Sequence, residues 1–377
     1  MQVDMHYYAV YYLSLAAGFD PEDAYKIAYS SQYVDDAREH QKISLVDEHG
    51  VKKILDPICT QHMSLQGFSE IAADKVFFPF HFVPKADIDD PIDKIITRPF
   101  DENSIHQKTF KKASSSGNFY RLGIALHALA DSYSHQYFAG EWSFVNEIKP
   151  MRYVLRRRIM PVHFIKSIGI VIWSWIKRFG QWIYTYIAPA IGHVRAYKVP
   201  DYPHAVWRFK NYEGLQIKRS NPDSFIRAGM EMYKQLKQFN KTENSLKDEL
   251  EVKEILQYIV YTTGLKKRRI KLWRKEILNV AQKKNIENKV KEFLHYDPKE
   301  WKQKAFKKNI SHSKELKPRK NKPYKINGSF NDFKNSDYYQ YLLAAKEQRI
   351  VILEALKKLL PRVKLSLKET KVKEILA

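Results

Sequence analysis

The side chains of His127, Asp131 and His135 could bind a metal ion, because they recur every four residues within an apolar segment. On an α-helix, a step of four residues turns by about 400°, so the three side chains share one stripe with a drift of about 40° per step. Two imidazoles and a carboxylate form a suitable ligand set for zinc or another divalent ion. A surface pair or a hydrogen-bonded core histidine is the plainer alternative, but three such groups on one apolar helix favour a metal site.

Further candidate ligands precede and follow this segment. Residues 1–150 hold eight of the thirteen histidines, so most candidates fall in the same part of the chain. The candidates are Asp4, His6, Asp35, His81 and His193. Each of them alone has a plain structural explanation, such as a helix-end charge or a packed core histidine. Asp201 is a weaker candidate, because an aspartate beside proline in a loop commonly forms a turn.

Helices must position these residues, and the sequence predicts an all-α fold. Asp20 is the expected N-cap of a helix that begins at Pro21 and ends near Ala37, since proline suits the first helical position. A second helix is expected at about 119–138 and carries the metal-binding stripe. No alternating run is long enough to predict a strand. Two further helices are expected at 221–239 and 338–360.

The order of these pieces resembles the all-helical superfamily of zinc-dependent phospholipase C and the single-strand-specific nucleases. The matching segments are Tyr33 to Asp35, Pro79 to Phe82 and, as the central signature, Leu126 to Gly140 (LHALADSYSHQYFAG). The likeness covers about residues 1–240 and is closest to an uncharacterised bacterial branch of that group.

In the characterised members of this superfamily, three zinc ions are bound and a metal-bound water attacks a phosphodiester. The resemblance therefore implies two or three zinc ions as the cofactor, with Asp131 bridging two of them and with Asp131 and Asp35 as the catalytic carboxylates. By the same likeness, Asp35, His81 and His127 complete one site, Asp4 and His6 serve a second, and His135 and His193 serve a third.

Three positions depart from the superfamily's pattern. The last histidine of the central motif usually falls six residues after the aspartate, where this chain has Tyr137, while His135 falls at four. Tyr197 stands four residues after His193, where the relatives carry an acid. Secreted relatives also use a processed N-terminal amine as a ligand, and in this chain the substitute would be Asp4.

The charge along the chain is strongly asymmetric. The 377 residues carry a net charge of +23, yet residues 1–150 hold only 14 basic against 21 acidic side chains. The basic excess of residues 151–377 favours an anionic partner, either nucleic acid or an anionic phospholipid surface. Composition further divides the chain into a metal-binding, hydrolase-like helical domain at 1–240 and a Lys-rich helical region at 241–377, with a basic linker near 300–335.

Two basic segments have alternative interpretations. The segment from Pro161 to Pro189 places isoleucines at helical spacing beside lysines and tryptophans, including Ile172, Trp173 and Ile176. Such a helix lies in a membrane surface or packs its apolar face on the core. The cluster from Lys266 to Arg269 either contacts phosphates or forms a solvated helix face.

Several classes of protein are excluded by simple features. The single cysteine, Cys59, excludes a disulfide framework and a thiolate zinc finger. The uncharged apolar stretch between Lys166 and Lys177 has ten residues, whereas a membrane-spanning helix needs about 20. The first residues lack the pattern of a secretory signal. A cytoplasmic location, or a peripheral position at the membrane, is therefore expected.

These features predict a metal-dependent phosphoric-ester hydrolase that acts on a phospholipid, with metal-activated water attacking phosphorus. The alternatives are a nuclease of single-stranded nucleic acid and a non-catalytic scaffold that is stabilised by metal and binds a membrane or nucleic acid. An open coordination position separates these classes, because structural metal sites are closed and catalytic ones keep a place for water.

Overall fold

A computed structural model describes most of the chain. The described residues are 1–61, 69–85, 93–155, 191–241, 247–262, 265–307, 316–319, 322–357, 360 and 375–376, with only the backbone described at 149–155. The expected amphipathic segment at 161–189 lies outside them.

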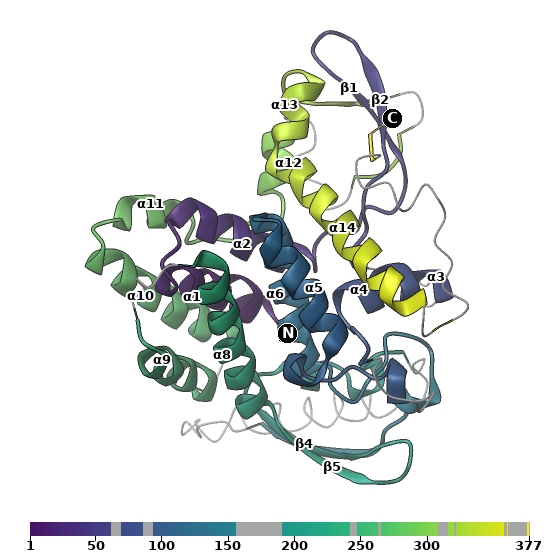
Figure 1. The fold of residues 1–377 in the computed structure, drawn as a ribbon, viewed down its shortest axis with the longest axis vertical. Helices are drawn as coiled ribbons and strands as arrows, with labels where there is room; N and C mark the ends of the chain where they lie inside the picture. Colours follow the sequence, from purple (N-terminus) through teal and green to yellow (C-terminus); the bar gives the residue numbers. More distant parts are fainter. Residues whose placement is uncertain are drawn as a thin grey trace, which may run out of the picture.

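Helix α6 (Phe119–Ser134) is the central element of the fold (Figure 1). It begins where the side chain of Asn118 accepts hydrogen bonds from the backbone N–H groups of Tyr120 and Arg121. Nearly all of its side chains are buried, because helices lie against several of its faces. The packed helices are α2 (Pro21–Tyr33), α5 (Ser104–Ser115), α8 (Asn221–Asn240) and α14 (Asp337–Lys357).

The closest approach is between α2 and α6, and it depends on Gly123. A Cβ atom at this position would lie 2.2 Å from the carbonyl oxygen of Ile27 and 2.6 Å from the Cβ of Ser30. Only glycine therefore allows the two backbones to pack at this distance. This contact brings the C-terminal end of α2, which leads to Asp35, toward the middle of α6 and His127.

The chain's first segment also packs in the interior. The π-helix η1 (Asp4–Ala9) and α1 (Val10–Ala16) lie against α10 (Lys266–Lys283), and α9 (Glu249–Tyr261) covers α8. One continuous hydrophobic core contains residues from both sides of the expected division at residue 240, among them Leu13, Leu126 and Trp273. Helix α11 (Glu287–Glu292) continues this layer beside α2.

Two small sheets correct the expectation of a purely all-α fold, and the protein is mainly helical with strands at opposite ends of the molecule (Figure 1). One sheet has the order β2–β1–β6 and the other β3–β4–β5. The strands are too short to give a long alternating run, although β4 reads Ala-Val-Trp-Arg-Phe-Lys with alternate residues buried. The strands are β1 (Ile43–Val46), β2 (Lys52–Leu55), β3 (Lys149–Leu155), β4 (Ala205–Lys210), β5 (Gln216–Ser220) and β6 (Tyr324–Lys325).

The expected basic linker near 300–335 is structured in the parts that are described. It contains α12 (Glu300–Ala305), strand β6 and α13 (Phe330–Asn335). Lys302 is buried and pairs with Glu39 at 2.7 Å, and Trp301 is fully buried beside Tyr29. The linker prediction was wrong for these residues, because it counted lysines and overlooked the aromatic residues between them.

The expected helices are otherwise present with adjusted ends. Helix α2 starts at the predicted cap, since the Asp20 carboxylate accepts from the N–H groups of Glu22 and Asp23. Helix α6 stops at Ser134, four residues earlier than expected, and His135 is its C-cap. Within the described residues, every helix is too short or too polar to cross a lipid bilayer.

Candidate metal centre

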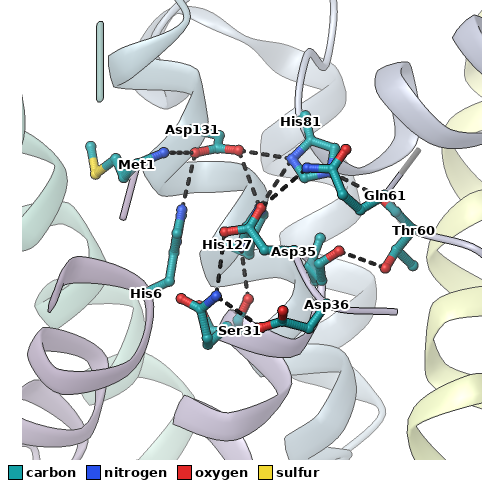
Figure 2. A network of polar contacts seen from close by, with 12 residues as sticks. Met1, His6, Ser31, Asp35, Asp36, Thr60, Gln61, His81, His127 and Asp131 are labelled. Carbon is teal, nitrogen blue, oxygen red and sulfur yellow. Dashed lines mark hydrogen bonds and ion pairs between the residues drawn. The ribbon is translucent and has the colours of Figure 1, made fainter. Parts of the chain in front are cut away.

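Five segments, α6 among them, contribute histidine and aspartate side chains around the C-terminal half of α6, and Figure 2 shows His6, Asp35, His81, His127 and Asp131. Helix η1 carries His6, and Asp35 follows the end of α2. His81 ends the short helix α4 (Phe78–Phe80). Helix α6 contributes His127, Asp131 and, at its C-cap, His135. The loop through η8 (Val194–Ala196) and η9 (Val199–Asp201) contributes His193 and Asp201.

Asp131 lies at the centre of this arrangement (Figure 2) and is almost completely buried. Its Oδ1 atom is 3.2 Å from Nε2 of His6 and 2.6 Å from the α-amino nitrogen of Met1. Its Oδ2 atom is 3.0 Å from Nδ1 of His81 and 3.1 Å from Nε2 of His127. One carboxylate therefore faces ligand-type atoms on both of its oxygens, as a bridging ligand would.

Among the residues that the structure describes, three groups of side chains have the proximity needed to hold a metal ion, with ligand atoms within 4.8 Å of one another in each group. The first two groups share His127, and Oδ2 of Asp131 lies 3.7 Å from Nδ1 of His135 in the third group, so the three groups adjoin one another. The first group is His6, His127 and Asp131, the second is Asp35, His81 and His127, and the third is His135, His193 and Asp201.

Backbone carbonyls fix the orientation of four of these imidazoles. His127 donates through Nδ1 to the carbonyl of Ser31 at 2.7 Å, and His81 donates through Nε2 to the carbonyl of Thr60 at 2.8 Å. His135 and His193 donate through Nδ1 to the carbonyls of residues 81 and 197 at 3.0 and 2.9 Å. Because a carbonyl can only accept, the nitrogen that faces it carries the hydrogen atom. The second nitrogen of each ring faces a carboxylate. Metal-binding histidines characteristically make this outer hydrogen bond.

His6 shows that the centre suits a cation. Its ring is fully buried and stacks on that of His127 at 3.9 Å between centroids, yet neither of its nitrogens has a hydrogen-bond partner. Leaving a buried polar atom unpaired costs about 1–3 kcal/mol. A divalent ion between His6, His127 and Asp131 would bind the nitrogen that faces Asp131 and would remove this cost.

The pKa shifts favour charged carboxylates at Asp131 and Asp201 and neutral imidazoles at His6 and His193, which is the state that binds metal. Burial lowers the pKa of His6 well below its ordinary value, and burial lowers that of His193 to about 4. Burial acts to raise the pKa of Asp131, but His135 and the Met1 amino group outweigh it and hold the pKa well below the usual range. Asp201 likewise has a lowered pKa, because the same amino group and His193 outweigh its burial.

Asp35 and His81 shift in the opposite direction. Burial raises the pKa of Asp35, and His127 and His81 only partly offset this effect. Burial acts to lower the pKa of His81, but its hydrogen bond to Asp131 outweighs burial and raises it. The hydrogen bond to Asp131 thus favours the protonated form of His81, and a metal ion bound at Nδ1 would compete with that proton.

The third group is the most accessible of the three. The side chains of His193 and Asp201 are 18% and 17% exposed, whereas those of His6 and His127 are fully buried. Asp35 of the second group is 26% exposed, so the centre has exposed surface both at Asp35 and along the 191–203 loop.

Seven of the eight predicted ligands meet at this centre, and Asp4 does not. The side chain of Asp4 is buried beside Arg269 of α10, and the two form an ion pair. Asp4 had been expected to replace a terminal amine, but the guanidinium group holds it away from the histidines. In the chain as given, the α-amino group of Met1 lies against Asp131 instead, and the two carboxylates of Asp131 and Asp201 raise its pKa to about 11 against the effect of burial.

Asp201 is the acid that sequence reasoning undervalued. Its Oδ1 is 3.4 Å from Nε2 of His135, and its Oδ2 is 3.7 Å from Nε2 of His193. Tyr197, at the place where an acid was expected, has φ +55° and offers its carbonyl to His193. The loop therefore presents its carboxylate four residues later, at Asp201. The lack of an acid at Tyr197 is the sequence feature that points to a later acid in the same loop.

The ion pair of Asp4 and Arg269 gives a first prediction. Replacing Arg269 with methionine should lower the free energy of unfolding by about 3–5 kcal/mol, because it leaves a buried carboxylate without its partner. Adding Asp4→Asn to this variant should restore part of the loss. Urea denaturation followed by circular dichroism measures both values. The metal content of Asp4→Asn should match that of the wild type, and a clear drop would return Asp4 to the ligand set.

Comparison with known proteins gives one match. No curated protein and no solved structure matches the chain. A family model of unknown function matches residues 1–356, which include every side chain of the three groups. The protein therefore belongs to the family of unknown function DUF6765.

Proposed function

We propose that this protein is a metal-dependent phosphoric-ester hydrolase that acts on a phospholipid. The observation that carries the proposal is the set of four imidazoles that are oriented by backbone carbonyls and face the carboxylates of Asp131 and Asp201. A purely structural histidine does not need this arrangement. His106, for example, is buried beside Phe100 and belongs to none of the groups. Burial lowers its pKa to about 3.

The chemistry follows from the donor atoms. Nitrogen and carboxylate ligands suit zinc, and ions held by these groups would lower the pKa of water and supply a nucleophile for in-line attack on phosphorus. Asp131 would hold two ions at a fixed separation. Asp35, which Gln32 and Gln61 approach at 3.5 Å each, would complete the ion shared with His81. This chemistry does not require a separate protein base.

Catalysis is favoured over a closed structural site by the difference in burial among the groups. The third group keeps exposed surface on His193 and Asp201, so a phosphate ester could reach it from solvent. A phospholipid is favoured as the substrate by the net charge of +23 together with the exposed apolar side chains Trp142 and Phe144, which flank the same loop region.

Hydrolysis by zinc-loaded protein tests the proposal. Release of a phosphorylated head group from phosphatidylcholine should be measurable with the wild type and should fall at least about 100-fold in His127→Ala, since His127 serves two groups. His106→Ala is the matched control, because it removes a buried histidine outside the centre. Equal rates in wild type and His127→Ala would contradict the proposal, and cleavage restricted to single-stranded DNA or RNA would identify a nuclease instead.

A further inference from the structure

The outward face of the β3–β4–β5 sheet carries cations in register across its strands. Arg208 of β4 pairs with Lys218 of β5, and Lys210 pairs with Gln216. In an antiparallel sheet, residues directly opposite each other point to the same face and lie about 5 Å apart. Arg208 and Lys218 therefore lie side by side on one face, and Lys210, two residues further along β4, lies on the same face and extends them into a row.

These cations face solvent because the other face of the sheet is committed to the core. Trp207 and Phe209 alternate with them along β4, and both rings stack near Phe138. Arg219 of β5, also on the inner face, is buried and donates to the carbonyls of residues 133 and 134 at the end of α6. Burial of this face fixes the register and leaves the positive side chains outside.

No acidic side chain in the described part of the chain neutralises the outer row. Arg208, Lys210 and Lys218 are exposed, and none of them forms an ion pair with a described residue. The nearest acid in sequence, Glu213 at the hairpin turn, accepts a hydrogen bond from Asn211. Like charges directly opposite each other destabilise a sheet, so this pattern is suited to an external anion.

Exposed apolar side chains lie at the hairpin end of the same sheet. Leu215 is 58% exposed at the turn that joins β4 to β5, and Phe144 and Trp142 are 56% and 67% exposed. Phe144 contacts Tyr212 of the turn, with ring centroids 5.5 Å apart. Since Lys210 and Gln216 are the last pair before the turn, the apolar end adjoins the cationic row.

We propose that the β4–β5 hairpin, together with Trp142 and Phe144, docks on an anionic phospholipid bilayer. Arg208, Lys210 and Lys218 pair with the head-group phosphates, and Leu215, Phe144 and Trp142 insert among the lipids. A bilayer is favoured over a nucleic acid because aliphatic Leu215 has no ring face for stacking on a base, whereas insertion uses aliphatic and aromatic side chains alike. The docking does not depend on the hydrolytic function proposed above.

Vesicle sedimentation with chelated protein tests this docking without turnover. The vesicles contain phosphatidylcholine alone or phosphatidylcholine mixed with phosphatidylserine. The triple variant Arg208→Gln, Lys210→Gln, Lys218→Gln should bind the mixed vesicles about 100-fold more weakly, at roughly fivefold for each cation at the surface. The matched control Lys266→Gln, Lys267→Gln, Arg268→Gln removes the same charge from the exposed start of α10 and should bind within about threefold of the wild type.

Salt separates the two parts of the surface. Replacement of Leu215, Phe144 and Trp142 with serine should remove the binding that persists at high salt, because apolar insertion is not screened. Equal loss in the two charge variants would overturn the proposal, as would equal binding to neutral vesicles. If the wild type binds single-stranded DNA but no vesicles, and the triple variant of Arg208, Lys210 and Lys218 binds the DNA more weakly, the surface belongs to nucleic acid. Hydrolysis of a soluble short-chain phospholipid should be unchanged in the triple variant of Arg208, Lys210 and Lys218. A failure of the docking proposal is therefore distinct from a failure of the hydrolase proposal.

Discussion

Replacing Asp131 with asparagine should leave the protein able to hold metal only in the group of His135, His193 and Asp201. The carboxylate touches ligand-type atoms on both oxygens, and the amide that replaces it is neutral and has only one oxygen. Loss of an outer-sphere partner alone lowers metal affinity by about 10–100-fold, so loss of a shared direct ligand should cost at least as much at each of two ions. Elemental analysis per chain, after removal of loose zinc, measures the effect.

His135→Ala is the informative partner of this experiment. Its imidazole belongs only to the third group, so we expect this variant to keep the ions of the other two and to lose one. Asp131→Asn should therefore lose the ions of the first two groups, and His135→Ala should lose the ion of the third. His106→Ala, which removes a buried histidine outside the centre, should keep all of it. Equal metal content in Asp131→Asn and His135→Ala would exclude a bridging role for Asp131.

The stripe on α6 shows what could be predicted from the sequence. Helical spacing is a local property, so it placed His127 and Asp131 on one buried face correctly. His135 deviates because α6 ends at Ser134, and the C-cap residue turns its ring toward the 191–203 loop instead of continuing the stripe. Helix ends are set by tertiary contacts, here by Arg219 donating to the last carbonyls of α6, and spacing does not contain that information.

Asp4 and Asp201 show the opposite limit. Both are single acids without a helical pattern, and their partners come from distant parts of the chain. Asp4 meets Arg269, which belongs to the cluster expected either to contact phosphates or to form a solvated helix face, and the fold buries both. Asp201 reaches the centre through a loop whose turn depends on the unusual backbone at Tyr197. Long-range ion pairs and loop geometry decide such positions.

Removal of metal should lower the stability of the folded protein substantially. A ligand that binds only the folded state adds about 4 kcal/mol to the free energy of unfolding when its free concentration is about 1,000 times the dissociation constant. Without a cation, each of the three groups keeps a carboxylate in place, and neither nitrogen of His6 makes a hydrogen bond. We therefore expect a chelator to lower the melting temperature and added zinc to restore it.

The variant His127→Ala separates this effect from any general action of the chelator. Since His127 takes part in two of the three groups, its removal should make the melting temperature respond much less to chelation and to zinc. His106→Ala should respond as fully as the wild type, because it lies outside the groups although its loss also destabilises the core. If wild type and His127→Ala shift by the same amount, zinc binds elsewhere, and the buried histidines and carboxylates then form a hydrogen-bonded network that does not require an ion.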